Sequence, residues 1–153
     1  MTLKQFFAPK SIKVVTMIFG VLSHIVNDNE RHTILNDVNS VLSDDGVFIL
    51  SVPNKHRRFR QEQRQQGTSS ISYSRNSNGT VLKMNYKLFD AAEIRQELLK
   101  ANFTGITITS ETIFAESWVV KYHWVAGLDR MLCHIVPRRW AYGLLIQAKK
   151  QPQ

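Results

Sequence analysis

Two short apolar runs with an amphipathic helix between them constrain the fold of this chain more than any other feature. The first run covers residues 13–19 and the second covers residues 47–52. Short runs that are apolar on both faces are typical of strands buried inside a parallel sheet, whereas surface strands alternate polar and apolar residues. The segment between the runs has apolar residues at helical spacing, namely Ile34, Leu35, Val38, Val41 and Leu42. We therefore expect a right-handed βαβ crossover with two adjacent, parallel strands.

The ends of these elements are marked by residues with strong local preferences. Asn27 and Asp28 offer side-chain oxygens that can cap the first turn of the helix. The Asp-Asp-Gly sequence at residues 44–46 is expected to stop the helix. Pro53 is expected to end the second strand, because proline cannot donate a hydrogen bond to a ladder.

A β-hairpin is predicted after the second strand, followed by a second helix. Residues 71–74 and 80–88 flank the sequence Asn-Ser-Asn-Gly at residues 76–79, and Asn-Gly is a strong turn signal. Asp90 then precedes a helical pattern with Glu93 at the capping-box position. The hairpin and the loop before it, over residues 55–88, are therefore interpreted as an insertion.

The last third of the chain predicts a strand, a helix and a final strand. Residues 106–113 alternate isoleucine with threonine, which favours a strand. Residues 116–135 are amphipathic and end before Pro137, and residues 140–148 form the last aliphatic run. We expect a single α/β domain over residues 1–153, with a mixed sheet of about four main strands.

The positive charge of the chain is concentrated in one segment. The net charge is +8, and six of the 20 cations fall between residues 54 and 75. These six are Lys55, Arg57, Arg58, Arg60, Arg64 and Arg75. Such a run can attract RNA or another polyanion. The glutamines and serines around it favour a solvated polar loop instead, and we expect residues 55–70 to be mobile.

Several classes of site and segment are not indicated by the sequence. The glycines make no Gly-x-Gly, so neither a P-loop nor a dinucleotide loop is predicted. The histidines make no His-Glu-x-x-His, and no metal site is expected. The single cysteine, Cys133, is interpreted as a small core residue. Neither a membrane span nor a secretory signal is recognised, so a soluble cytoplasmic domain is expected.

Three segments together resemble a known protein family. These are residues 14–25 with the helix that follows them, residues 45–54 with their Pro-Asn exit, and residues 86–89 with the Asp90 helix. Their order and spacing resemble the fourth strand, fifth strand and late helix of class I S-adenosylmethionine-dependent methyltransferases. The resemblance implies a partial Rossmann-like methyltransferase fold. It also implies that the last strand lies antiparallel between the second and third main strands.

The resemblance also implies which residues face the ligands. Residues at the end of the first run match positions that line the cofactor pocket, and the next two match positions near the methyl acceptor. The cofactor positions are Phe19, Gly20, Val21 and Leu22, and the acceptor positions are Ser23 and His24. His24 is either a substrate contact or proton acceptor, or a histidine that bonds a backbone group at a helix start. Gly20 either permits close approach of a ligand or makes a plain turn.

The sequence has no counterpart of the family's first strand, its glycine-rich loop or the acidic residue that grips the ribose. Lys13 and Asp45 also depart from the family pattern. The resemblance therefore implies the C-terminal half of a methyltransferase, which transfers a methyl group in the complete fold and is inactive alone. Binding of S-adenosylmethionine by this chain alone is expected to be weak or absent. The alternatives are a non-catalytic module that binds RNA or another polyanion through residues 55–64, or a truncated gene product.

The same absence leaves one side of the strand from Val14 to Phe19 without a hydrogen-bonding partner. Natural sheets protect such edges with charges, proline or a covering segment. We therefore expect a partner along this strand. It is a second copy of the chain, a companion N-terminal fragment, or the chain's own first ten residues folded back.

Overall fold

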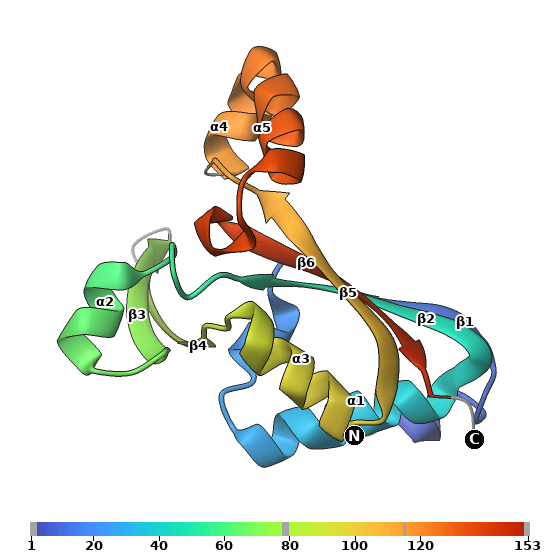
Figure 1. The fold of residues 1–153 in the computed structure, drawn as a ribbon. Helices are drawn as coiled ribbons and strands as arrows, with labels where there is room; N and C mark the ends of the chain where they lie inside the picture. The colour runs from blue at the N-terminus through green and yellow to red at the C-terminus, as the bar shows by residue number, and fades with distance from the viewer. Residues whose placement is uncertain (1–2, 78–79, 115, 152–153) are drawn as a thin grey trace.

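The computed structural model describes residues 3–77, 80–114 and 116–151, and within them the strands form two sheets. The larger sheet has the order β1-β2-β6-β5 (Figure 1). Its strands are β1 (Ile12–Met17), β2 (Leu42–Pro53), β5 (Phe103–Thr112) and β6 (Gly143–Lys150). β1 is parallel to β2, and β6 is antiparallel to both β2 and β5. Both the expected parallel pair and the expected position of the last strand are confirmed.

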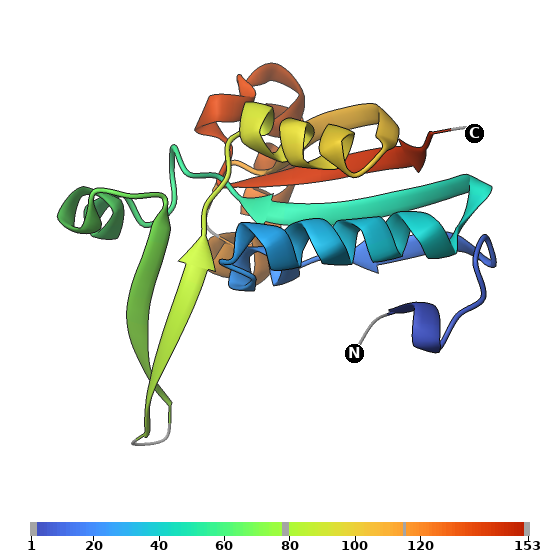
Figure 2. The ribbon, with the colours of Figure 1, turned by 90° about the horizontal axis from the view of Figure 1, so that it is seen from below.

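Two helices cover one face of this sheet. α1 (Asp28–Val41) and α3 (Ala91–Lys100) lie side by side on the same side of the strands (Figures 1 and 2). Their inward residues pack on alternate residues of the central strands, and this cluster includes Leu35, Val38, Phe48, Leu50, Ile94, Leu98, Phe103 and Ile146. The apolar residues that repeat at helical spacing in α1 and α3 therefore pack in one core with those that alternate along β6.

Both helices begin at the predicted caps. The side chain of Asn27 accepts hydrogen bonds from the backbone N–H groups of Asn29 and Glu30. Asp90 and Glu93 form the complete capping box, in which each side chain accepts a hydrogen bond from the other residue's backbone N–H. These bonds satisfy amides that have no partner within the helix.

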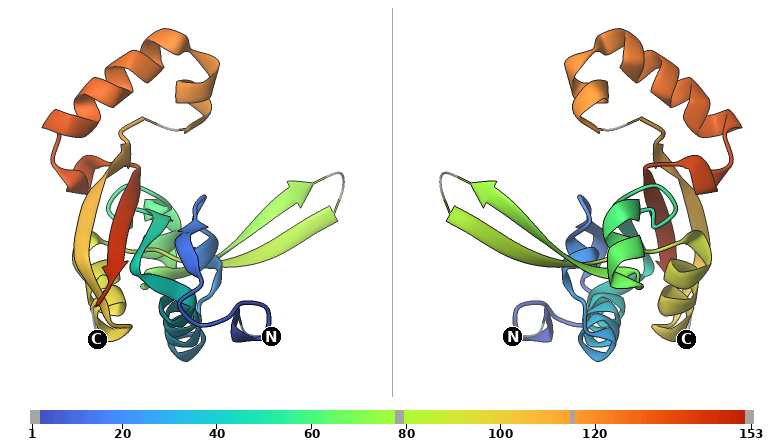
Figure 3. Two further views of the ribbon diagram at one scale, coloured as in Figure 1. Left: turned by 90° about the vertical axis from the view of Figure 1, so that its right-hand side faces the viewer. Right: turned by 90° about the vertical axis from the view of Figure 1, so that its left-hand side faces the viewer.

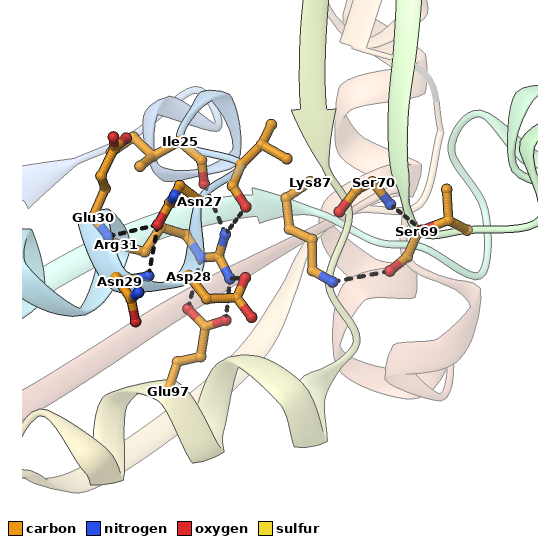
Figure 4. Close-up of polar contacts among 12 residues, drawn as sticks. Ile25, Asn27, Asp28, Asn29, Glu30, Arg31, Ser69, Ser70, Lys87 and Glu97 are labelled. Carbon is orange, nitrogen blue, oxygen red and sulfur yellow. Dashed lines mark hydrogen bonds and ion pairs between the residues drawn. The ribbon is translucent and has the colours of Figure 1, made fainter.

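A buried arginine joins the two helices (Figure 4). Arg31 on α1 is 1% exposed, and its guanidinium donates to both carboxylate oxygens of Glu97 on α3, at 3.0 and 2.8 Å. It also donates to the carbonyl oxygens of Ile25 and Val26 and to Asp28. Burial alone would lower the pKa of Arg31, but the bonds to Glu97 and Asp28 raise it above its ordinary value. The cation is thus fully partnered in the interior.

The other face of the sheet is open near β1, which corrects one expectation. Residues 13–19 were expected to be buried, yet Val14 is 54% exposed and Thr16 is also exposed. Register pairs Val14 with Val47 and Thr16 with Ile49, so these four side chains lie on one face, opposite the helices. The apolar run is therefore suited to burial, but the described residues cover only one of its faces.

The N-terminal residues do not fill the open edge of β1. The short helix η1 (Leu3–Gln5) packs against α1, where Lys4 lies 3.5 Å from Asp37. Within the described residues β1 pairs only with β2. The alternative in which the first ten residues fold back along this strand is therefore wrong for the described part of the chain.

Part of the basic segment after β2 is a helix, which corrects the expectation of a loop there, whereas its mobility stays a prediction. α2 (Arg60–Gln66) precedes the hairpin of β3 (Ser70–Ser77) and β4 (Thr80–Lys87). Glutamine side chains fix it: Gln63 donates to the carbonyls of Lys55 and Arg58, and Gln66 bonds both the N–H and the carbonyl of Ser72. The hairpin is confirmed, although part of its expected turn, residues 78–79, lies outside the described residues.

The hairpin and a pair of C-terminal helices project from the main sheet (Figure 3). The expected helix at residues 116–135 is instead two helices, α4 (Glu116–Lys121) and α5 (His123–Ile135). The break lies at Tyr122, whose backbone is extended. None of the helices in the described residues is long and apolar enough to cross a membrane.

β2 also begins five residues earlier than expected, at Leu42, with an irregular register before Val47.

Candidate functional site

A cavity of about 370 Å³ opens where β1 and β2 end. Phe19 and Gly20 form one wall, and Tyr86 of β4 closes it from the hairpin side. Glu111 of β5 and Val119 of α4 are also part of the lining. The volume lies within the range of about 300–1,000 Å³ that is usual for small-molecule pockets. Sheets of this kind bind ligands at the carboxyl ends of their parallel strands, so the cavity is the natural candidate site.

The chain turns sharply at the base of this cavity. Phe19 and Gly20 both have left-handed backbones, with φ of 60° and 70°. The N–H of Phe19 donates to the hydroxyl of Ser51 on β2, at 2.9 Å, which holds the turn against the sheet. A Cβ on Gly20 would collide with the hydroxyl of Tyr86. Glycine is thus required here both for the turn and for a close approach, and the approaching group is a tyrosine of the same chain.

Aromatic rings hold the hairpin against the site. The ring of His24 meets that of Tyr86 edge to face, with centroids 4.6 Å apart. Phe59 and Tyr73 stack at 5.0 Å, and Tyr86 contacts both. Arg58 lies over the ring of Tyr142, 4.7 Å from its centroid. Pairs of this kind add about 0.5–1.5 kcal/mol each beyond their buried area, so the aromatic cluster fixes where Tyr86 stands.

The six residues implied by the resemblance divide into three groups. Phe19 and Gly20 line the cavity, and Phe19 is 82% exposed. Val21 is half exposed, whereas Leu22 is fully buried in the main core and presents no side chain to the cavity. Ser23 and His24 belong to the short helix η2 (Val21–His24), with Ser23 buried and His24 exposed beside Tyr86. Their roles toward a cofactor or acceptor stay predictions.

Two polar groups near the site make no hydrogen bond within the described part of the chain. They are the buried hydroxyls of Ser23 and Thr112, and Thr112 lines the cavity. Buried hydroxyls normally have a partner, so these two are exceptions within the described residues. Thr112 and Tyr86 were missed at the sequence level, because they come from β5 and β4 and reach the site only through tertiary packing.

The basic segment contributes less free charge than its sequence suggests. The ammonium of Lys55 lies 2.6 Å from Asp90 and 2.8 Å from Glu93. Burial alone would raise the pKa of Asp90, but Lys55 and the capped amides hold it below its ordinary value. Arg57, Arg60 and Arg64 remain exposed.

Cys133 lies on α5, does not line this cavity, and should react slowly. Burial and then the charge of Asp129 raise the pKa of its thiol to about 11. At pH 8 the thiolate fraction is far smaller than for an ordinary cysteine, and we expect alkylation by iodoacetamide to be roughly 20-fold slower than that of a free thiol. The rate should rise with pH up to the pKa, and mass spectrometry of the intact chain follows it. A reaction as fast as that of glutathione at pH 8 would contradict this environment for the thiol.

Solved structures with a similar fold include S-adenosylmethionine-dependent methyltransferases. A putative one from Listeria monocytogenes is 19% identical, with a TM-score of 0.59, over 95% of this chain and 64% of its own. One from Methanosarcina mazei is 14% identical, with a TM-score of 0.62, over 97% of this chain and 63% of its own. The 1,6-didemethyltoxoflavin-N1-methyltransferase of Burkholderia thailandensis was solved with 1,6-didemethyltoxoflavin and S-adenosylhomocysteine bound. It is 16% identical, with a TM-score of 0.53, over 97% of this chain and 48% of its own.

These likenesses show the fold of the chain. No protein-family model and no curated protein matches the sequence. The mixed α/β fold of class I methyltransferases, expected from the three sequence segments, is confirmed by the structural neighbours. The chain spans less than two thirds of the length of each of these structures.

Proposed function

We propose that this chain forms the acceptor-facing part of an S-adenosylmethionine-dependent methyltransferase. In the complete fold it would help to transfer the methyl group to a nitrogen, oxygen or carbon nucleophile. The observation that carries the proposal is the cavity at the ends of β1 and β2, built on the turn at Gly20. Support also comes from neighbours of this fold, one of which was solved with S-adenosylhomocysteine bound and another, DhpI, as a complex with SAH.

The residues around the cavity suit a reaction that depends on alignment. Methyl transfer needs the acceptor and the methyl group to be held in line, and positioning of this kind can supply much of the rate. Phe19 and Gly20 would face the cofactor. Tyr86 and His24 stand on the hairpin side, where they would contact the acceptor. A neutral imidazole at His24 can take a proton from an acceptor that needs to lose one.

The open edge of β1 explains why we propose that the chain is inactive alone. Ile18 is 40% exposed, Phe19 82% and Val21 50%, so no other part of the described residues covers these side chains. The described residues add no strand beyond β1. We propose that a companion N-terminal fragment pairs with β1 and supplies most of the cofactor's binding surface.

Calorimetric titration of the isolated chain with S-adenosylhomocysteine tests this proposal. We expect binding no tighter than about millimolar, because the described residues leave the site open beyond β1. Amide shifts at Gly20 and Thr112 in NMR spectra at high ligand concentration would locate that weak binding in the cavity. Micromolar or tighter binding would overturn the claim that a partner is needed. Shifts confined to other surfaces would overturn the assignment of the site.

The alternative of a polyanion-binding module has less support. Lys55 is already paired with two carboxylates. The guanidinium of Arg58 lies over the ring of Tyr142, and Arg58 lines the cavity. The three exposed arginines of the segment are spread along a short helix and its approach. If RNA does bind, its affinity should fall steeply between about 50 and 200 mM salt. We expect no binding at the higher concentration.

A further inference from the structure

The outward face of α5 carries an apolar stripe that nothing in the described residues covers. Its members are spaced by four, three and four residues, and each is exposed: Trp124 69%, Leu128 42%, Met131 53% and Ile135 71%. At about 100° per residue they fall within an arc of about 60° on the helix. A different set faces inward, with Val125 and Asp129 buried and Leu132 packed against the core. The stripe is thus additional to the face that holds α5 on the protein.

α4 extends the same kind of surface. Trp118 is 59% exposed and Val120 82%. A second cavity brings Trp118, Tyr122 and Trp124 together at the junction of the two helices. We call the exposed apolar residues of α4, α5 and the break between them the helical patch, and they are Trp118, Val120, Tyr122, Trp124, Leu128, Met131 and Ile135. Tryptophan and tyrosine are the residues that membrane interfaces favour, because one part of each ring is apolar and the other polar.

Between residues 118 and 140 the exposed charges are all of one sign. From residue 118 to residue 140 the cations are Lys121, Arg130, Arg138 and Arg139, and each is exposed. The acidic residue in this stretch, Asp129, is 4% exposed and accepts hydrogen bonds from the N–H groups of Ile113 and Phe114. It therefore presents no negative charge outward. An apolar helix face bordered by exposed cations suits a surface of anionic lipids.

The position of the two helices leaves this face accessible. α4 and α5 connect β5 to β6 and project beyond the end of the sheet (Figures 1 and 3). β5 is the outer strand opposite β1, so a partner that pairs with the edge of β1 adds its strand on the far side of the sheet.

We propose that α4 and α5 form a membrane-surface anchor that lies in the plane of an anionic lipid bilayer. The helical patch enters the headgroup region, and the four cations contact the lipid phosphates. Val119 and Val120 of α4 also line the cavity at the strand ends, so docking places the mouth of that cavity beside the lipid. The anchor is independent of the reaction that the fold carries out.

Vesicle co-sedimentation with the full chain tests the anchor. The probes are phosphatidylcholine vesicles with and without about 30% phosphatidylserine. The variant is Leu128→Glu with Met131→Glu. The matched control is Val81→Glu with Leu82→Glu on the projecting hairpin, where both residues are also exposed and the change in net charge is the same. Tryptophan fluorescence serves as a second readout, since two of the three tryptophans lie in the helical patch.

We expect the parent chain and the control to bind the anionic vesicles with similar affinity, and the α5 variant to bind at least about tenfold more weakly. Binding should weaken as salt rises from about 0.1 to 0.5 M, and the tryptophan emission should shift to the blue on binding. Absence of binding by the parent chain would overturn the proposal, as would equal losses in the two variants. Dimers that are dissociated by the α5 variant, without vesicle binding, would instead identify the helical patch as an interface between copies.

Discussion

Replacing Arg31 by alanine should lower the free energy of unfolding by about 3–5 kcal/mol, measured by urea denaturation at neutral pH. Arg31 is 1% exposed, and its removal takes the bidentate partner from Glu97 and the donor from two backbone carbonyls. Unpartnered groups cost much more in the interior than the net value of the original bonds. The contact with Asp28 contributes little, because that carboxylate is 87% exposed.

Two further variants separate the charge from the packing. Arg64→Ala removes an exposed arginine from α2 and should change the stability by less than about 0.5 kcal/mol. Arg31→Met with Glu97→Leu replaces both charges by apolar groups and should recover much of the loss. If the double variant is as unstable as Arg31→Ala, the pair does not act through unpartnered charge, and this account of the contact between α1 and α3 is wrong.

The main sheet could be predicted from local sequence signals that agree with one another. The two apolar runs, the capping residues Asn27 and Asp90, and the aliphatic last strand each specify an element without long-range information. Handedness and the family resemblance then fix the order of those elements. These local signals were enough to predict the main sheet because each element buries its apolar side against the same core.

Two of the errors concern features that composition and periodicity do not reveal. Residues 55–70 are polar enough for a loop, but Gln63 and Gln66 use their amides to bond backbone groups and hold α2 in place. The amphipathic pattern of residues 116–135 predicts a helix with one apolar face, which packs on the core. In the structure α5 has two apolar faces, one buried and one exposed, and the composition of the helix does not show which face is buried.

The candidate site was predictable only in part for the same reason. Gly20 and Phe19 could be found because they end an apolar run, and a glycine at a strand end is a visible signal. Tyr86 and Thr112 reach the cavity from β4 and β5, each more than 60 residues away along the chain. A single sequence gives no indication of such contacts.

Gly20→Ala should destabilise the chain by about 2–4 kcal/mol and loosen the hairpin, whereas Gly67→Ala should cost only about 1 kcal/mol. The two glycines have nearly the same backbone, with φ of 70° and 66°. The strain of a left-handed alanine is therefore common to both variants. At Gly20 the added methyl also meets Tyr86, while at Gly67 it meets no atom within 4 Å. The difference between the variants measures the close approach alone.

Hydrogen exchange of the amides in β3 and β4 should show whether the added methyl group displaces the hairpin. In Gly20→Ala, displacement of Tyr86 breaks its ring contacts with His24 and Phe59, so exchange in the hairpin should accelerate by tenfold or more, about 1.4 kcal/mol. Adding Tyr86→Phe removes the hydroxyl that the methyl strikes and should restore most of the protection. Equal effects of the two glycine variants, with no rescue by Tyr86→Phe, would show that Gly20 serves the turn alone. The cavity wall would then not depend on the contact between Gly20 and Tyr86.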